Sequence, residues 1–401
     1  MQNNFLRAIF MAIMLVLTWS SLHASWIYTE TNTVANGVSK GSLTDGVWTF
    51  YAYREKGAVT ELTVDASKGG VSIDPAAPAK IDFSEIEGGY KVVKFAGWRN
   101  SASPLCLYTT EFIAPHCTTL SEQDVFSGNL NLTKVEFCKD EPLSTAGSPD
   151  RYFKNCTNLV TFEPRRIKGV LGDMFLNCSG LEGAFEVVDA TTIAAFSGCS
   201  KLGEITLRKV NTIGQYAFDG CTSLSNIVIG TPITKIGNYA FRNCKNLTTE
   251  IVQRLLSKDL TMWGNAVNNR IGCFMNCTGL TGTLVIDLPN LVTNVIPASC
   301  FSGCQSLERV EIKSEELVDI GADSFSGIKT GAEVVMPKNV IKGVFGARAV
   351  WNKNELYCVP YPKICLKGDV EAWLQKIKVN HYMIEKSGFE DSTWDQAEIS
   401  G

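Results

Sequence analysis

Residues 213–230 read IGQYAFDGCTSLSNIVIG and hold one cysteine, Cys221, inside an apolar pattern. Variants of this stretch recur along most of the chain, and the cysteine usually recurs with them. Such self-similarity is the signature of a repeat architecture. Aligned on phenylalanine, the copies begin VFSGNLNL, YFKNCTNL, MFLNCSGL, AFSGCSKL, AFDGCTSL, AFRNCKNL, CFMNCTGL, CFSGCQSL and SFSGIKTG, at positions 125, 152, 174, 195, 217, 240, 273, 300 and 324.

The spacing between these phenylalanines is nearly constant. Four consecutive steps, from Phe153 to Phe241, are 22, 21, 22 and 23 residues long, and the longest step, Phe241 to Phe274, is 33. A near-constant period with longer exceptions indicates a solenoid that carries insertions. One coil cannot bury its inward side chains alone. Stacked coils can, and each buried apolar side chain then contributes roughly 1.5–3 kcal/mol.

Apolar residues also follow the cysteine at fixed positions, as in Leu224, Ile227 and Ile229. The last two are two residues apart, as on one face of a β-strand. The pattern therefore predicts one short strand, a turn and a return segment in each coil. We expect a β-rich solenoid in which these strands stack in parallel.

The pattern I-G-x-x-A-F-x-x-C-x-x-L-x-x-I-x-I resembles the BspA-like leucine-rich repeat of bacterial surface and secreted proteins. The resemblance covers residues 120–345 and weakens at the last copy, where Ile328 replaces Cys and Gly331 replaces Leu. It implies a right-handed leucine-rich repeat array with short strands, closed at the C-terminal end by a strand and a helix. It also implies a surface or adhesion role toward a host or neighbouring-cell protein.

The N-terminal residues depart from the repeat. Residues 1–24 read as a signal peptide, because Arg7 precedes a short apolar run at 9–17 and the small residue Ala24 suits cleavage. The run is too short to span a bilayer as a stable helix, although a membrane anchor is the alternative interpretation. We expect an exported chain without a transmembrane segment, either secreted or at the cell surface, with the periplasm as a further option.

Three more segments are expected after the signal. Residues 25–100 lack the repeat, and the segments 47–53, 62–64 and 90–95 alternate like strands, which predicts a β-rich N-terminal cap. A separate binding domain is the alternative for this region. The solenoid is expected at residues 101–345, and a solenoid needs its open ends covered.

The C-terminal residues 346–401 are expected to form a cap and a polar tail. Leu356–Pro360 reads as a last strand, and Asp369 can cap a helix that runs through Ile377. This strand and helix are the elements that the resemblance implies for the closing end of the array.

Seven cysteines occupy one position of the repeat, three residues after a phenylalanine. In the outer copies Asn129 and Ile328 stand there, and these residues share with cysteine only a compact side chain. Free cysteine behaves as a small hydrophobe. We therefore predict a buried structural ladder, formed by Cys156, Cys178, Cys199, Cys221, Cys244, Cys277 and Cys304 with Phe153, Phe175, Phe196, Phe218, Phe241, Phe274 and Phe301.

Zinc binding and nucleophilic catalysis are alternatives for these cysteines. Cys273 with Cys277, and Cys300 with Cys304, have three residues between them, a spacing that suits a four-thiolate zinc site. Both members of each pair nevertheless fall on repeat positions, which favours packing. A Cys–His nucleophile needs one unusual cysteine, and none in the repeat is unusual. We expect no metal, no cofactor and no catalytic residue.

Disulfides are a further alternative, because export permits them. Neighbouring ladder Cα atoms about 4.8 Å apart lie within bridging range. Stacked parallel side chains point the same way, however, and seven is an odd number, so we expect the ladder to be reduced. Outside the repeat, Cys106 with Cys117 and Cys358 with Cys365 could each close a hairpin, and isolated buried thiols are the other interpretation for these residues and Cys138.

The longest step between phenylalanines holds an insertion at about 249–271. Thr248 and Thr249 can begin a helix that runs through Leu256. Insertions in repeat proteins map to one face, often the binding face. Trp263 is therefore the first candidate for a partner contact, and packing over the inserted helix is the alternative.

Composition and motifs restrict the function. A formal net charge of −4 implies no electrostatic attraction to nucleic acid or anionic lipid. The one G-x-S-x-G string, at 37–41, lies among turn signals and lacks the flanking strand and helix of a nucleophile elbow. We expect no enzyme. The leading hypothesis is a solenoid that presents an extended surface for protein binding.

Glycan binding, or handling of polysaccharide as an accessory protein, is the alternative function. It predicts clustered exposed aromatic side chains in the cap or the insertion, with Trp48, Tyr51, Tyr53 and Trp263 as the candidates. An enzyme would instead need a cleft with converging titratable groups.

Overall fold

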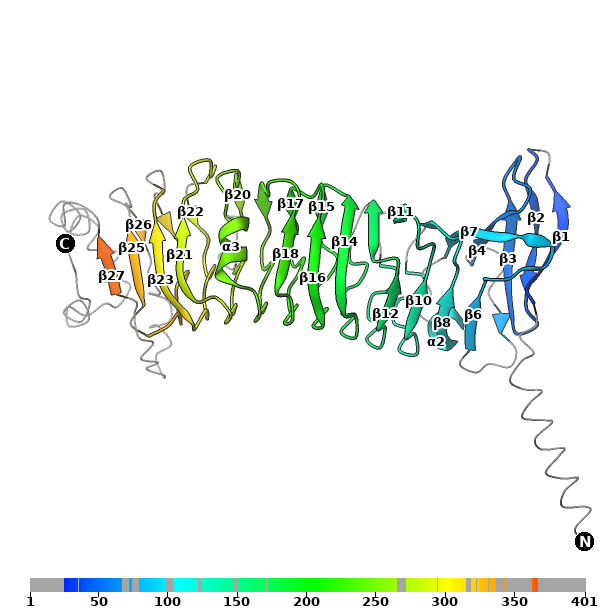
Figure 1. The fold of residues 1–401 in the computed structure, drawn as a ribbon, viewed down its shortest axis with the longest axis horizontal. Coiled ribbons are helices and arrows are strands. Elements are labelled where there is room, and N and C mark those ends of the chain that lie inside the picture. Colours follow the sequence, from blue (N-terminus) through cyan, green and yellow to red (C-terminus); the bar gives the residue numbers. More distant parts are fainter. Residues whose placement is uncertain are drawn as a thin grey trace, which may run out of the picture.

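Repeated coils give the protein an elongated shape, with the strands of successive coils side by side along its length (Figure 1). The structure, a computed structural model, describes residues 25–314 except 35, 67–71, 74–78, 98–103, 122–123, 147–150, 170–171, 265–271 and 294, and then 319–321, 323–330, 332–336, 342–343 and 363–366. The predicted signal peptide, Cys358 and the predicted helix from Asp369 to Ile377 lie outside the described residues.

Antiparallel strands cover the N-terminal end of the solenoid. β1 (Ile27–Thr33), β2 (Ser39–Thr44) and β3 (Trp48–Arg54) pair in chain order, and β4 (Glu61–Asp65) and β5 (Ser72–Ile73) both pair antiparallel with β3. One face of β3 is buried, since its residues alternate between buried and half-buried positions. From that face the ring of Phe50 lies 5.8 Å from Phe83 and 6.1 Å from Phe95, so the sheet closes one end of the core.

Parallel pairing begins at β4 and continues coil by coil. We call the strands that enclose the core the wall of the solenoid. In the first coils the wall consists of two parallel sheets. One sheet continues from β4 through β7 (Lys91–Ala96), β9 (Thr119–Ser121), β11 (Leu143–Ala146) and β13 (Arg166–Gly169). The other holds β6 (Ala79–Asp82), β8 (Thr109–Ile113), β10 (Lys134–Glu136) and β12 (Thr161–Glu163), and short helical segments stand at η1 (Glu87–Gly89) and α2 (Pro104–Tyr108).

The wall changes at β14 (Gly183–Asp189), the first long strand of the repeat. It pairs in parallel with β13 on one side and with β16 (Leu202–Leu207) on the other, and β16 pairs with β18 (Asn226–Ile229). Each coil from here also has a second strand of two residues, in a sheet of its own formed by β15 (Thr192–Ile193), β17 (Thr212–Ile213), β19 (Lys235–Ile236) and β20 (Met262–Trp263). The expectation of one strand per coil is therefore wrong, because two-residue strands give no alternating pattern.

The helix α3 (Thr249–Leu255) separates β18 from the next long strand. Beyond it, one parallel sheet holds β21 (Gly282–Ile286), β23 (Leu307–Ile312), β25 (Glu333–Met336) and β27 (Lys363–Leu366), and another holds β22 (Val295–Ile296), β24 (Asp319–Ile320) and β26 (Lys342–Gly343). The predicted solenoid of short parallel strands is confirmed.

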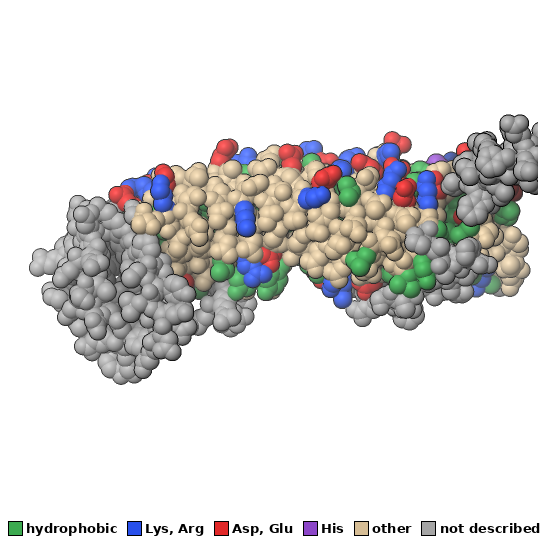
Figure 2. Space-filling view, turned by 90° about the horizontal axis from the view of Figure 1, so that it is seen from below, with side chains coloured by type: hydrophobic (Ala, Val, Ile, Leu, Met, Phe, Trp, Pro, Cys, Tyr) green, Lys and Arg blue, Asp and Glu red, His purple; other side chains and the backbone are tan. Residues whose placement is uncertain are grey.

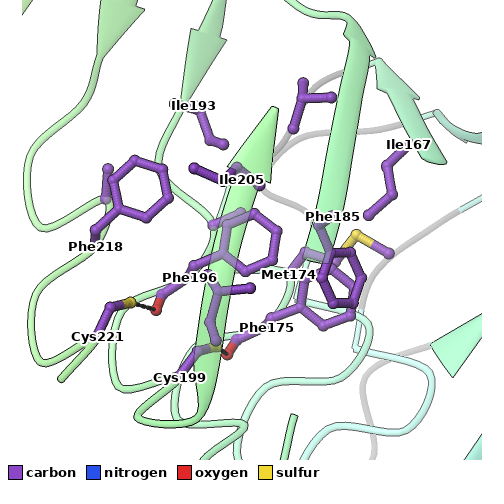
Figure 3. Close-up of a cluster of buried hydrophobic side chains, with 14 of the residues drawn as sticks. Ile167, Met174, Phe175, Phe185, Ile193, Phe196, Cys199, Ile205, Phe218 and Cys221 are labelled. Atoms are coloured by element: carbon purple, nitrogen blue, oxygen red, sulfur yellow. Dashed lines mark hydrogen bonds between the residues drawn. The ribbon is translucent and has the colours of Figure 1, made fainter. Parts of the chain in front are cut away.

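One continuous apolar core runs through all described coils. The side chains that fill it come from the repeat positions, and Figure 3 shows a section in which Ile205, Phe196 and Phe218 point inward from neighbouring coils. Burial of mainly apolar side chains at the same positions of successive coils is what holds the coils together.

Candidate functional site

The phenylalanines of the nine repeat copies form one stacked column. Successive ring centroids lie 5.2–6.1 Å apart, and neighbouring ring planes deviate by no more than 19°. The column extends beyond the repeat, since Phe95 stacks on Phe126 at 6.2 Å and 17°. Aromatic pairs at these distances stabilise each other beyond the burial of their area.

Each of the seven ladder thiols donates a hydrogen bond to the carbonyl of the phenylalanine in the preceding coil. The Sγ–O distances run from 2.9 to 3.2 Å. The same carbonyl accepts a second bond from its own coil, as Phe196 O does from the amide of Cys199 at 3.1 Å and from Sγ of Cys221 at 3.0 Å (Figure 3). Both lone pairs of the carbonyl are thus used, and each thiol links two coils.

Asn129 is a hydrogen-bond donor at the ladder position, as the cysteines are, whereas Ile328 of the last copy has no side-chain donor. Its Nδ2 donates to the carbonyls of Leu105 at 2.9 Å and Thr109 at 2.8 Å, and its Oδ1 accepts from the amides of Asn131 and Leu132. The interpretation that cysteine and asparagine share only a compact side chain is therefore wrong. The signal was the asparagine itself, because a buried amide side chain requires hydrogen-bond partners.

Burial suppresses the chemistry of these thiols. It raises the pKa of Cys304 to about 12, and it raises the pKa of Cys156, Cys178, Cys199 and Cys244 well above the usual value. The thiolate is the nucleophile and the metal ligand, so a thiol that stays protonated is a poor candidate for either role.

The alternative pairings of cysteine are not assembled in the described part of the chain. The twelve cysteines from Cys106 to Cys304 are free thiols, so Cys106 and Cys117 are not bridged. Cys273 and Cys300 are fully buried beside the phenylalanine column, where alanine stands in other coils. Among the described residues, no group of three or more His, Cys, Asp or Glu side chains is placed to hold a metal ion.

Trp263 belongs to the core. Only 2% of it is exposed, and its ring lies edge-on to Phe274 at 6.4 Å and to Phe301 at 5.8 Å. In β20 it pairs in register with Ile236, so it occupies the isoleucine position of the second strand. The buried ring fits the packing interpretation rather than a partner contact. The sequence hid this because the insertion obscures the repeat register.

The other aromatic candidates and the serine of the G-x-S-x-G string all lie in strands β2 and β3. Trp48 is fully buried, whereas Tyr51 and Tyr53 are half-buried on the opposite face of β3, with ring centroids 6.0 Å apart. Ser39 of the G-x-S-x-G string lies in β2 and is 8% exposed. It is a strand residue and not the tip of a turn before a helix, as a nucleophile elbow requires.

The outward side chains of β14, β16 and β18 form the strand face, defined by Glu186, Glu204, Thr206, Asn226 and Val228. Bonds between neighbouring strands cross it: Arg166 Nε and Arg208 Nε donate to Glu186 at 3.1 and 2.5 Å, and Asn226 Nδ2 donates to Glu204 at 2.8 Å. Hydrogen bonds from Arg208 and then Arg166 hold the pKa of Glu186 below its usual value.

Charge on the described surface is mixed in sign. Figure 2 shows acidic and basic side chains interspersed along the molecule, without a large block of either. Val228, 42% exposed, places an apolar side chain within the polar strand face. Such a surface suits a partner with its own mixture of charges and small apolar contacts.

The helix α3 stands where a strand of the wall is missing, and its side chains replace that strand's backbone. Gln253 Nε2 donates to the carbonyl of Val285 at 2.7 Å, and Gln253 Oε1 accepts from the amide of Val285 at 2.9 Å. On the other side, Arg254 Nη2 donates to the carbonyl of Ile227 at 2.5 Å. Both neighbouring strands thus have polar groups of their edges satisfied.

The start of α3 agrees with the sequence prediction. Thr248 is the N-cap, since its side chain accepts a hydrogen bond from the amide of Ile251 at 3.4 Å. Ile251, Val252 and Leu255 are buried and anchor the helix on the core. The predicted inserted helix is confirmed.

Comparison with known proteins agrees with this geometry. The BspA type leucine rich repeat region matches residues 105–193, 188–260 and 267–363, with six copies. The chain belongs to this family. A solenoid of this family offers an extended surface of the kind that suits protein binding. A search of the curated proteins gave no match.

Several solved structures match the chain at low identity. A leucine rich cell surface protein of Faecalibacterium prausnitzii is 16% identical, over 83% of this chain and 96% of that one, with a TM-score of 0.35. A leucine-rich repeat protein of Bacteroides ovatus is 18% identical, over 82% of this chain and 96% of that one, with a TM-score of 0.42. The leucine rich repeat protein of T. pallidum is 17% identical, over 54% and 95%, with a TM-score of 0.33.

Within the described residues, no helix has the length and apolar character needed to cross a membrane.

Proposed function

We propose that this member of the BspA type repeat family is a non-enzymatic, exported protein whose strand face binds another protein. The surface next to α3 carries the proposal. There α3 interrupts the wall of strands, and the exposed Val228 lies one residue beyond Ile227, whose carbonyl accepts a hydrogen bond from Arg254 of the helix. Arginine is enriched among the residues that anchor interfaces, and the exposed Val228 adds an apolar contact within a polar face.

The area of the wall supports a protein rather than a small ligand. Stable protein interfaces bury roughly 800 Å² on each partner and take most of their binding energy from a few anchors. The parallel strands β14, β16 and β18 and the flanking α3 present their outward side chains on one continuous support. Glu186, held by Arg166 and Arg208, supplies a polar group of fixed orientation on it.

A capture experiment with two matched valine variants tests this function. The purified chain is immobilised and exposed to surface proteins of the cells and hosts around the producing organism. We expect the wild type and Val59→Asp to retain a protein that Val228→Asp loses, by about tenfold or more. Val59 is 76% exposed and lies outside the strand face, so it controls for the added charge. Recovery of no partner, or equal loss by both variants, would contradict the proposal.

Export and the domain division are part of the same proposal. Residues 1–24 are proposed to be removed as a signal peptide, with 25–100 and 346–401 closing the ends of the solenoid at 101–345. Fractionation of cells that produce the full chain, with N-terminal sequencing, measures both location and cleavage. A chain that stays in the cytoplasm with Met1 intact would contradict it.

We also infer that the ladder of phenylalanines and thiols is structural. The seven Sγ–carbonyl bonds and the raised thiol pKa values support this role. A thiol-labelling reagent is then expected to modify these residues slowly in the folded chain and rapidly in denaturant. Equal rates in both states, or stoichiometric zinc in the purified protein, would oppose a structural role.

A further inference from the structure

Two tyrosines occupy a left-handed backbone position that the other coils with this conformation fill with Asp, Ser or Gly. The residue two before the phenylalanine has a positive φ in six coils. Asp, Ser and Gly tolerate this left-handed conformation readily, whereas a bulky side chain adopts it rarely. The residues are Asp124 (61°), Tyr216 (57°), Tyr239 (55°), Gly272 (33°), Ser299 (56°) and Asp323 (59°). The fold therefore does not require tyrosine here, and such outliers point to function.

The two rings are stacked along the axis of the solenoid. Their centroids lie 5.4 Å apart, and their planes deviate by 10°. Gly272 closes the far side of Tyr239, because a Cβ at Gly272 would lie 3.0 Å from Cε1 of that ring. Tyr216, by contrast, is 37% exposed.

The preceding coil has no aromatic residue that could stack on the outer face of Tyr216, since Ala194 stands at the matching position. Ile193 pairs in register with Ile213, but Phe196 follows Ile193 by three residues and Phe218 follows Ile213 by five. The preceding turn is thus two residues shorter, and its Ala194 packs against Gly214, where an added Cβ would lie 3.1 Å from the Ala194 Cβ. The shorter turn leaves a step in the molecular surface beside the exposed ring of Tyr216.

A charged pair is held rigidly next to the rings. Cζ of Arg242 lies 4.7 Å from the ring centroid of Tyr239 and 5.6 Å from that of Tyr216. The guanidinium donates twice to Asp219, from Nε to Oδ1 at 2.9 Å and from Nη2 to Oδ2 at 2.5 Å, and Asn243 Nδ2 also donates to Oδ1 at 3.4 Å. The Asp219 side chain is 13% exposed, so only part of its carboxylate faces solvent. Among the described residues, Nη1 of Arg242 makes no hydrogen bond, so a donor of fixed orientation remains beside the aromatic surface.

We propose that Tyr216 is a platform on which a pyranose ring of a neutral glycan stacks, with Arg242 and Asp219 bonding its hydroxyl groups. A pyranose has a face of C–H groups that suits an aromatic ring and a rim of hydroxyls that suits a paired donor and acceptor. The ligand is neutral because Asp219 balances the charge of Arg242.

The surroundings of Tyr216 favour a sugar over a protein side chain. Gln215, the residue before it, is exposed and polar, and the backbone amide of Tyr216 donates to the carbonyl of Asn238 at 3.0 Å, which fixes the turn that carries the ring. Protein hot spots are instead ringed by contacts that exclude water. This site lies in the turns between strands and not on the strand face. Its test is therefore independent of the test of protein binding.

Saturation-transfer NMR and titration of the purified chain test the proposal. The probes are cellobiose, maltose, lactose and N,N′-diacetylchitobiose, followed by an array of neutral and acidic glycans. We expect at least one neutral saccharide to receive saturation on the C–H protons of one ring face. Tyr216→Asn should weaken its binding by about tenfold, and Tyr216→Phe should keep it within about twofold, because the ring is retained.

Asparagine is the informative substitution because it tolerates a positive φ, so Tyr216→Asn is expected to keep the fold and to lose only the stacking on Tyr239. Ser299→Asn, at the same position of a later coil, is the matched control and should bind as the wild type does. Silence across the disaccharides and the array would overturn the proposal. So would undiminished binding by Tyr216→Asn, binding of acidic glycans alone, or loss of a protein partner by Tyr216→Asn in a chain that binds no saccharide.

Discussion

The regular coils around β16 and β18 and the coil that carries α3 enclose the same core with different outer walls. In the regular coils, backbone bonds join neighbouring strands in register, as Ile205 does with Ile227. At α3 the strand is absent, and side chains of the helix bond the edges of β18 and β21 instead. Beneath both walls the column is unchanged: Phe241 stacks on Phe274 at 5.3 Å and 1°.

This contrast separates two requirements of the solenoid. The inner column of rings and thiols sets the stacking of coils, and it continues across the insertion with the usual bond, from Cys277 Sγ to Phe241 O at 3.1 Å. The outer wall only has to satisfy the polar edge groups of its neighbours. A repeat protein can therefore rebuild its outer surface, where partners bind, without disturbing the core.

Truncation of the column is expected to have the largest effect, and to be equal under the two walls. Phe218→Ala and Phe274→Ala should each lower the free energy of unfolding by about 3–5 kcal/mol, because each removes a fully buried ring. Urea denaturation of the full chain measures both, with Lys245→Ala on the surface as control. A markedly smaller effect for Phe274→Ala would show that the coil next to α3 does not depend on the column.

Loss of the side chain that replaces a strand comes next. Gln253→Ala leaves the amide and carbonyl of Val285 without the partners they have now, which should lower stability by about 1–3 kcal/mol. Hydrogen exchange of the Val285 amide should accelerate in this variant. Glu250→Ala, on the exposed face of α3, is the control and should change stability by less than about 0.5 kcal/mol. An unchanged exchange rate of the Val285 amide would mean that the edge of β21 does not depend on the hydrogen bonds from Gln253.

Removal of a thiol donor should have a smaller effect. Cys221→Val keeps a compact apolar side chain but loses the bond to Phe196 O, whose second bond, from the amide of Cys199, remains. We expect a loss of about 1 kcal/mol in thermal or urea denaturation, and the same for Cys277→Val next to α3. Two variants as stable as the wild type would show that packing alone explains the cysteines.

Removal of the ion pairs that Glu186 forms on the strand face is expected to have the smallest effect on stability. Because the folded pKa of Glu186 is lowered from 4.5, its contribution is present above about pH 4.5 and is lost as the pH falls through the folded pKa. Its arginine partners are well exposed, so we expect about 0.5 kcal/mol. The difference in melting temperature between the wild type and Glu186→Gln should shrink from pH 7 to pH 3. A difference that stays constant with pH would exclude the ion pairs as its source.

The sequence predicted what repeats and missed what occurs once. The phenylalanine and cysteine positions, the strand after Leu224 and the helix after Thr248 all follow from local pattern and capping. For Trp263 the sequence left a partner contact and packing both open, because an insertion hides its register, and the register appears only when Ile236 is seen beside it. The partners of Gln253 lie 32 residues away in the chain, and no periodicity indicates them.

The sequence by itself determined the architecture, because a side chain repeated every 21 to 23 residues can be buried only by stacking one coil on the next. The tertiary structure alone decided which of the remaining side chains face solvent together. A turn shortened by two residues opens one face of Tyr216, and a glycine in a later coil closes the far side of Tyr239. These surfaces depend on differences in length between neighbouring coils, and such differences acquire meaning only once the core has set those coils in register.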